Sequence, residues 1–140
     1  MTEGPRRPCV LLVDDYQDAR EMYREYLQCH GFDVVEASNG MEALRRAVDA
    51  SPDIILMDLS LPVMDGWEAT RRLKADPRTS AIPVVALTGY DQSGMREGAA
   101  PALCNAVVTK PCLPEDLVKE IRHVLGASQR FLVKGSSTET

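Results

Sequence analysis

The chain has 140 residues, of which 44% are hydrophobic and 26% charged, a composition that fits one globular domain rather than a disordered segment. Its net charge of -5 argues against broad nucleic-acid binding, which relies on clustered Lys and Arg side chains. The hydrophobic runs are far shorter than a membrane span, and the N-terminus lacks the apolar core of a signal peptide. These features predict a cytoplasmic protein with no nucleic-acid or membrane partner.

Four cysteines, Cys9, Cys29, Cys104 and Cys112, show neither CxxC pairs nor a zinc-finger spacing with the two histidines. Isolated thiols in a cytosolic protein are usually small apolar side chains of the core. We therefore expect no metal or redox role for them.

The first part of the chain alternates short hydrophobic runs with helical patterns. The run 9–13 predicts a strand and ends in two carboxylates, Asp14 and Asp15. Residues 18–29 repeat apolar side chains at helical spacing, and 32–37 have the pattern of a second short strand.

A second helix is predicted from Asn39 to about Ala50. Asn39 and Glu42 have the Asn-x-x-Glu spacing of a capping box. Apolar residues at helical spacing predict which face of this helix is buried: Met41, Leu44 and Val48.

The run 54–57 is wholly apolar and leads directly to Asp58. A strand without alternating polar residues suits the middle of a parallel sheet, which is covered on both faces. Asp65 and Glu68 then resemble the cap of a third helix, which continues through Leu73.

Two further strands are predicted in the last third of the chain. Residues 82–88 end in the hydroxyl of Thr88, and residues 105–109 are followed by Lys110. Between them, 90–103 predicts a short or distorted helix because it contains residues that weaken or stop helices: Gly94, Gly98 and Pro101.

A last helix is predicted to begin at Pro114, with Glu115 and Asp116 in its first turn and Gly126 as its end. Four residues at helical spacing predict its buried face: Leu117, Ile121, Val124 and Leu125.

Five strands that alternate with five helices predict an α/β fold with a parallel sheet and right-handed crossovers. Residues 8–126 form the predicted domain. Residues 1–7 are predicted to be a flexible N-terminal segment, and residues 127–140 a polar C-terminal tail.

Every candidate functional group follows the carboxyl end of a predicted strand: Asp14, Asp15, Asp58, Thr88 and Lys110. Ligands of open α/β sheets bind outside these strand ends. Three carboxylates at one edge repel each other, and the usual remedy is a bound cation. Oxygen ligands with room for water suit Mg²⁺.

These groups also suit phosphoryl transfer. Lys110 and Thr88 can neutralise and hydrogen-bond phosphoryl oxygens while an aspartate attacks the phosphorus and forms an acyl phosphate. Such a site works by stabilising charge, with little acid–base chemistry.

The chain resembles the receiver domains of two-component response regulators. The resemblance covers about residues 8–126 and rests on four motifs in order: VLLVDD at 10–15, DLSLPVMDG at 58–66, LT at 87–88 and TKP at 109–111. It implies a flavodoxin-like, doubly wound sheet with strand order 2-1-3-4-5. It also implies that Asp58 is phosphorylated by a sensor histidine kinase or histidine phosphotransfer protein.

The resemblance further implies that Asp15, Asp58 and the backbone carbonyl of Ser60 bind Mg²⁺ directly, while Asp14 acts mainly through water. Thr88 and Lys110 match the switch hydroxyl and the phosphate-binding lysine. The implied protein is a signalling module rather than an enzyme, although it assists its own phosphorylation. It would act on a downstream protein target as a monomer or weak homodimer.

Three positions depart from the usual pattern of this family. Val107 stands where many receivers carry a Tyr or Phe that swings inward on activation, Gly89 follows the switch threonine, and Pro101 interrupts the fourth helix. These departures leave the phosphorylation chemistry intact but alter the route of the signal. We expect that route to run through residues 89–103.

Two other readings use the same predicted sheet edge. One is a small flavodoxin-like ligand-binding protein or phosphatase, which would need a Gly-rich phosphate loop where this chain has the acidic residues 14–18. The other is a receiver that forms part of a longer chain, such as a hybrid kinase, where it would relay phosphoryl groups within that protein.

Overall fold

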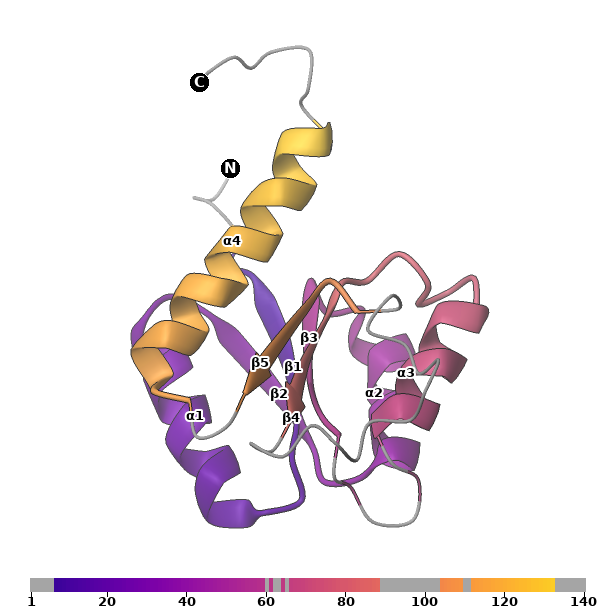
Figure 1. The fold of residues 1–140 in the computed structure, drawn as a ribbon, viewed down its shortest axis with the longest axis horizontal. Coiled ribbons are helices and arrows are strands. Elements are labelled where there is room, and N and C mark those ends of the chain that lie inside the picture. The colour runs from indigo at the N-terminus through magenta and orange to yellow at the C-terminus, as the bar shows by residue number, and fades with distance from the viewer. Residues whose placement is uncertain are drawn as a thin grey trace.

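The computed structural model describes residues 7–59, 61, 64, 66–88, 104–109 and 112–132, with the side chains of 127–132 excepted. The elements in chain order are β1 (Cys9–Val13), α1 (Gln17–Cys29), β2 (Asp33–Ala37), α2 (Gly40–Ala50), β3 (Ile54–Asp58), α3 (Gly66–Ala75), β4 (Val84–Thr88), β5 (Ala106–Thr109) and α4 (Pro114–Leu132) (Figure 1). Among the described residues, none of the helices has the length and apolar character needed to span a membrane.

The five strands form one parallel sheet in the order β2-β1-β3-β4-β5, which confirms the predicted topology. Its central strands are the most apolar ones, as expected where both faces are covered. The register aligns Val13 with Met57, Asp58 with Leu87, and Thr88 with Thr109. The carboxyl ends of these strands therefore lie at one edge.

Helices cover both faces of the sheet, with α1 and α4 on one side and α2 and α3 on the other (Figure 1). Strand residues alternate between the two resulting cores. Leu11, Ile55 and Met57 belong to the core beneath α2 and α3, whereas Leu12 and Leu56 belong to the core beneath α1 and α4. All five side chains are fully buried.

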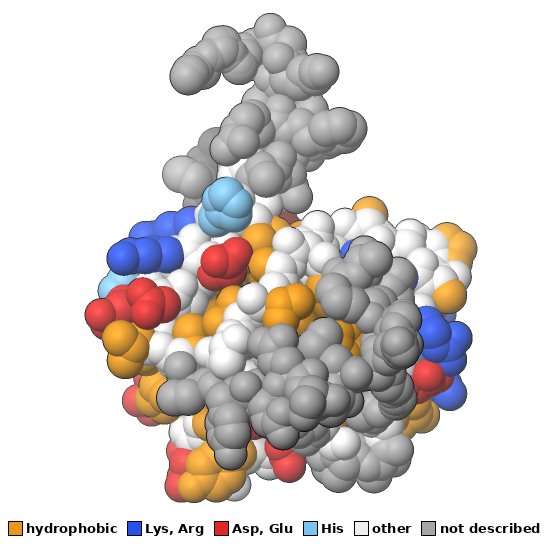
Figure 2. Space-filling view, viewed as in Figure 1, with side chains coloured by type: hydrophobic (Ala, Val, Ile, Leu, Met, Phe, Trp, Pro, Cys, Tyr) orange, Lys and Arg blue, Asp and Glu red, His pale blue; other side chains and the backbone are white. Residues whose placement is uncertain are grey.

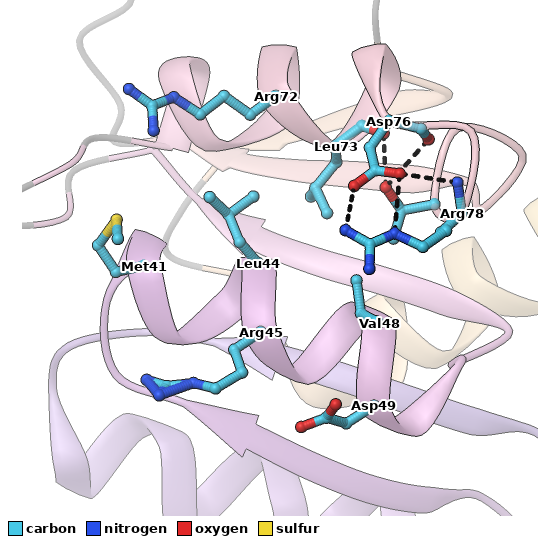
Figure 3. A pocket seen from close by; sticks show the side chains of 10 residues that line it. Met41, Leu44, Arg45, Val48, Asp49, Arg72, Leu73, Asp76 and Arg78 are labelled. Atoms are coloured by element: carbon cyan, nitrogen blue, oxygen red, sulfur yellow. Dashed lines mark hydrogen bonds and ion pairs between the residues drawn. The ribbon is translucent and has the colours of Figure 1, made fainter.

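The predicted buried face of α2 is only partly correct, because Leu44 packs against the core but is only partly buried, and Met41 is exposed. Small residues face the sheet instead, namely Gly40, Ala43 and Ala47, while Met41 is 50% exposed. Met41, Leu44 and Val48 line an open groove of about 620 Å³ between α2 and α3 (Figure 3). Periodicity marked the larger side chains, but small residues let the helix backbone approach the sheet closely.

The capping box at the start of α2 is confirmed in one half and altered in the other. The Asn39 side chain accepts a hydrogen bond from the Glu42 backbone N–H at 2.8 Å. The Glu42 carboxylate accepts from the backbone N–H of Ser38 at 2.7 Å, one residue earlier than the predicted partner. This backbone hydrogen bond is the main cause of the lowered pKa of Glu42.

The predicted end of the last helix at Gly126 is also wrong, because α4 continues to Leu132. A glycine inside a helix costs only about 1 kcal/mol relative to alanine, so it weakens a helix without stopping it. The part of the predicted polar tail from 127 to 132 is therefore helical. Four helices lie in the described residues, and the predicted distorted helix at 90–103 lies outside them.

The four cysteines are free thiols. Burial raises the pKa of the Cys104 and Cys112 thiols, which is opposite to the shift that makes a thiolate reactive.

On the face shown in Figure 2, acidic and basic side chains lie beside each other on the flanks, and the described part of that face has no continuous basic patch.

Thr70 on α3 tests the cost of a buried hydroxyl. Among the described side chains, its Oγ1 is buried without a hydrogen-bond partner. We predict that Thr70→Val raises the free energy of unfolding by about 1 kcal/mol, because valine keeps the shape and removes the unsatisfied group. Urea unfolding measures the change.

Thr79→Val is the matched control. Thr79 is also buried, but its hydroxyl donates to the Leu73 carbonyl at 2.7 Å, so this substitution should destabilise the protein. A loss of stability for Thr70→Val as large as that for Thr79→Val would contradict our account of Thr70.

Candidate functional site

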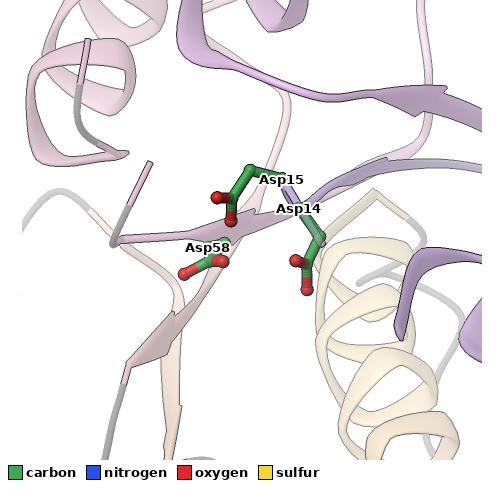
Figure 4. Close-up of side chains that lie close together, drawn as sticks. All are labelled: Asp14, Asp15 and Asp58. Carbon is green, nitrogen blue, oxygen red and sulfur yellow. The ribbon is translucent and has the colours of Figure 1, made fainter. Parts of the chain in front are cut away.

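An acidic cluster lies at the carboxyl edge of the sheet. Asp14 directly follows β1, Asp15 is its neighbour, and Asp58 is the last residue of β3. One carboxylate oxygen from each lies within 4.8 Å of the others, and Figure 4 shows the three side chains converging. Asp14 is fully buried and Asp58 is 4% exposed, whereas Asp15 is exposed. The sequence predicted this convergence.

Local backbone contacts hold Asp14 in place. Its own N–H donates to the Ala37 carbonyl of β2 at 3.1 Å, and its carboxylate accepts from the Tyr16 N–H at 2.9 Å. A buried carboxylate needs such donors because burial removes the hydrogen bonds of water. Asp14 therefore joins the end of β1 to the start of α1.

Arg20 on α1 adds a contact that the sequence patterns did not reveal. Its guanidinium donates to the Asp14 backbone carbonyl at 2.8 Å and to the Glu36 carboxylate at 2.9 Å. Arg24, one turn later, donates to the other oxygen of Glu36 at 2.7 Å. This arginine pair ties α1 to β2 beside the acidic cluster.

Glu36 is held as an anion by this pair of arginines. Partial burial acts to raise its pKa, but hydrogen bonds from Arg24 and Arg20 outweigh burial and leave the pKa lowered. The same contacts raise the pKa of Arg24.

Two glycines allow the chain after Asp58 to pack closely. A Cβ on Gly66 would lie 2.7 Å from the Leu59 Cα and closer still to the Asp58 carbonyl oxygen. A Cβ on Gly40 would lie 2.6 Å from the Met64 carbonyl oxygen. Real side chains do not fit at these distances, so the starts of α2 and α3 both need glycine beside this segment.

Thr88 ends β4 and is 6% exposed. Its strand pairs with β3 so that Asp58 lies opposite Leu87, and this register places Thr88 at the same edge as the acidic cluster. Ser60 and Lys110, which the sequence also singled out, lie outside the described residues, as does Asp65. Val107 lies in β5 and is 38% exposed.

The donor set of the acidic cluster consists of carboxylate oxygens, some buried and one exposed. Hard oxygen ligands that leave part of the coordination shell to water suit Mg²⁺ better than softer transition metals. The chemistry of the residues present is therefore compatible with a magnesium site.

A doubly wound parallel sheet with an acidic cluster at its carboxyl edge is the arrangement expected of a phospho-accepting receiver domain. The family model of the response regulator receiver domain matches residues 10–122, and the chain belongs to this family. Accepting a phosphoryl group on an aspartate is the general function of receivers. This membership decides against the alternative of an unrelated flavodoxin-like ligand-binding protein or phosphatase.

Individual relatives agree with this assignment. The chain is 33% identical to the polar-differentiation response regulator DivK of Brucella anthropi over 117 residues, which are 84% of this chain and 95% of the relative. The receiver domain of the sensor histidine kinase PA1611 of Pseudomonas aeruginosa, solved with magnesium in its active-site cleft, is 31% identical, with a TM-score of 0.79. That comparison covers 86% of this chain and 99% of PA1611's receiver.

A further solved relative is the chemotaxis protein CheY4 of Vibrio cholerae, which is 31% identical with a TM-score of 0.77. The aligned region covers 85% of this chain and 99% of CheY4. Both stand-alone response regulators and a kinase receiver are thus among the proteins that this chain resembles.

Glu36→Gln tests the arginine pair. We predict a loss of about 1 kcal/mol in the free energy of unfolding at neutral pH, because two charge-assisted hydrogen bonds weaken. The pKa of Glu36 is lower in the folded chain than its ordinary value of 4.5. Its stabilisation is therefore complete above that value and disappears as the pH falls through the lower folded-state pKa.

Urea unfolding of wild type and Glu36→Gln at several pH values measures this difference. Glu25→Gln is the matched control. Glu25 is exposed, and its carboxylate lies 3.9 Å from the Arg24 guanidinium, which is too far for a hydrogen bond. A stability difference for Glu36→Gln that grows towards acid pH would contradict the assigned role.

Gly66→Ala tests the close packing of α3 against the backbone of Asp58 and Leu59. We predict a loss of about 1–3 kcal/mol in the free energy of unfolding, because the added methyl group overlaps the backbone of Asp58 and Leu59. Gly126→Ala is the matched control in α4, where an added Cβ meets nothing within 4 Å. It should stabilise the protein by about 0.5–1 kcal/mol through helix propensity. Equal effects of the two substitutions in thermal or urea unfolding would refute the packing argument.

Proposed function

We propose that Asp58 accepts a phosphoryl group and that the phosphorylated chain signals by protein contact. The observation that carries this proposal is the convergence of three carboxylates within 4.8 Å at the edge of the sheet. Asp58 belongs to the central strand β3 and lies between the ends of β1 and β4. A phosphoryl group on Asp58 would therefore be flanked by Asp14 and Asp15 on one side and by Thr88 on the other.

The environments of the three carboxylates support different roles. The Asp14 carboxylate is fully buried and engaged by the Tyr16 N–H. Asp15 is exposed, which suits a group that meets a hydrated cation from solvent. Asp58 is nearly buried at the end of a rigid strand, which suits a nucleophile that must be held in line with its target.

We assign a Mg²⁺ site to Asp15, Asp58 and the backbone carbonyl of Ser60, with Asp14 acting mainly through water. Bound Mg²⁺ would supply positive charge that offsets the repulsion of the carboxylates and of the incoming phosphoryl group. The magnesium described in the PA1611 receiver supports this choice of ion.

Phosphoryl transfer then needs few protein groups. An Asp58 carboxylate oxygen forms a bond to phosphorus while the phosphorus–nitrogen bond of a donor phosphohistidine breaks. The imidazole nitrogen keeps the electron pair of that bond and is protonated. Thr88 would donate a hydrogen bond to a phosphoryl oxygen, and Lys110 would neutralise another.

A sensor histidine kinase or histidine phosphotransfer protein is the proposed donor, since receiver domains in general interact with histidine kinases. A downstream protein is the proposed target, and a cytoplasmic location belongs to the same proposal. The chain is proposed to act as a signalling module that is a monomer or weak homodimer, without a nucleic-acid partner.

We expect wild-type chain to gain one phosphoryl group from phosphoramidate in the presence of Mg²⁺, and Asp58→Asn to gain none. The amide removes the nucleophilic oxygen with little change in size. Intact-mass measurement detects the added group. Asp49→Asn, an exposed carboxylate in the last turn of α2, is the control and should react like wild type. If Asp58→Asn gains a phosphoryl group as the wild type does, Asp58 is not the acceptor.

Asp15→Ala should weaken Mg²⁺ binding by about tenfold or more, because loss of even an indirect contact to a metal commonly costs that much. A Mg²⁺ titration followed by Trp67 fluorescence measures affinity, since Trp67 is the single tryptophan and follows Gly66 in α3. Asp18→Ala removes an equal charge from the first turn of α1 and is the control. Equal Mg²⁺ affinities for Asp15→Ala and wild type would remove Asp15 from the metal site.

A further inference from the structure

Tyr23 on α1 makes a long-range contact that the proposed chemistry does not yet include. The residue is 5% exposed, and its hydroxyl donates to the Cys112 backbone carbonyl at 2.8 Å. The two residues are 89 positions apart in the chain. This hydrogen bond therefore joins α1 to the connection between β5 and α4.

Cys112 occupies a short connection with a functional neighbour. It lies between Thr109, which ends β5, and Pro114, which begins α4. Lys110 precedes it by two residues, so the Cα atoms of Lys110 and Cys112 are at most about 7 Å apart. A hydrogen bond to the Cys112 carbonyl is therefore a constraint on the chain two residues from Lys110.

The connection between β5 and α4 has few backbone N–H groups that could donate hydrogen bonds. Pro111 and Pro114 have no backbone N–H to donate. The Leu113 carbonyl accepts from the Asp116 and Leu117 N–H groups and so begins α4. The Cys112 carbonyl, one residue closer to Lys110, is instead held by the phenol of Tyr23.

Packing alone explains the ring of Tyr23 but not its hydroxyl. The ring belongs to the core beneath α1 and α4, together with Leu27 and Leu117. A phenylalanine would fill the same space. The hydroxyl adds a directional hydrogen bond to a carbonyl from another part of the chain, and buried tyrosines are held in one orientation by such bonds.

We propose that Tyr23 is a positioning residue for phosphoryl transfer, which holds the Cys112 carbonyl and thereby the backbone that carries Lys110. The proposal rests on the proposed function. Its counterpart on the same helix is Arg20, one turn earlier, which holds the Asp14 carbonyl at 2.8 Å. Two side chains of α1 at i and i+3 thus hold the β1 end and the β5 end of the same edge.

The full chain and its Tyr23→Phe variant test the proposal through two measurements. Amide exchange followed by mass spectrometry should be faster in peptides covering 110–113 for the variant. The phosphorylation rate with phosphoramidate at saturating Mg²⁺ should fall by about three- to tenfold, because small misplacements of a charged group weaken its stabilisation of the transition state. The Mg²⁺ midpoint should stay within about twofold, because the Asp14, Asp15 and Asp58 carboxylates belong to β1 and β3.

Tyr26→Phe is the matched control, since it removes the same hydroxyl from the next turn of α1, where the ring stacks on His30. It should match wild type in exchange, rate and Mg²⁺ midpoint. A Tyr23→Phe variant with wild-type exchange at 110–113, or with a wild-type rate, overturns the proposal. So does a parallel loss of rate and Mg²⁺ affinity, which would indicate general loosening of the fold.

A double-mutant cycle with Lys110→Ala shows whether Tyr23 acts through the lysine. In the Lys110→Ala background, Tyr23→Phe should change the rate by less than about twofold, because the group that it positions is absent. A further loss as large as that in the wild-type background overturns the proposal. Failure of the wild-type chain to become phosphorylated would instead refute the proposed function, while the exchange measurement would still decide whether Tyr23 holds the connection.

Discussion

Repulsion among three carboxylates is the constraint around which this edge of the molecule is built. Their oxygens lie within 4.8 Å of one another, and two of the three side chains are almost fully buried. In a medium of low dielectric such a group is costly unless donors or a cation compensate it. The parallel register, which aligns the ends of β1, β3 and β4, forces the carboxylates together. The cluster is therefore a consequence of the sheet topology, and the surrounding residues must offset the repulsion among its carboxylates.

Backbone contacts of Asp14 help to make the arrangement tolerable. Arg20 contacts the backbone carbonyl of Asp14, and it shares the Glu36 carboxylate with Arg24. A full positive charge on the carboxylates themselves would compete with a metal ion for the same oxygens. The network thus fixes the end of β1 through the Asp14 backbone. Gly66 and Gly40 help to fix the segment after Asp58, because they allow close backbone contact without adding charge.

The sequence predicted the strands and the strand-end carboxylates because both follow from local patterns. An apolar run followed by a charged residue marks the end of a buried strand, and parallel pairing then brings these ends together. Prediction from the sequence failed where burial or contact depends on how closely separate helices and strands pack. Met41, Leu44 and Val48 have the same helical spacing as a buried face, yet Ala43 and Ala47 face the sheet. Likewise, no spacing rule connects Arg20 to Glu36 or Tyr23 to Cys112, because these contacts arise only when separate elements are packed.

The same contacts limit how a charge added at Asp58 can be transmitted. Towards β1 the edge is tied by Arg20 and the Tyr16 N–H, and towards α3 it is tied by the close approach of Gly66. Val107, with a single side-chain torsion and 38% exposure, lacks the ring that would fill space vacated by Thr88. We expect a response that uses neither of these sides nor an aromatic exchange to pass through the residues that follow Thr88. Our hypothesis for residues 89–103, which lie outside the described part of the chain, therefore rests on the contacts that hold the described residues at this edge.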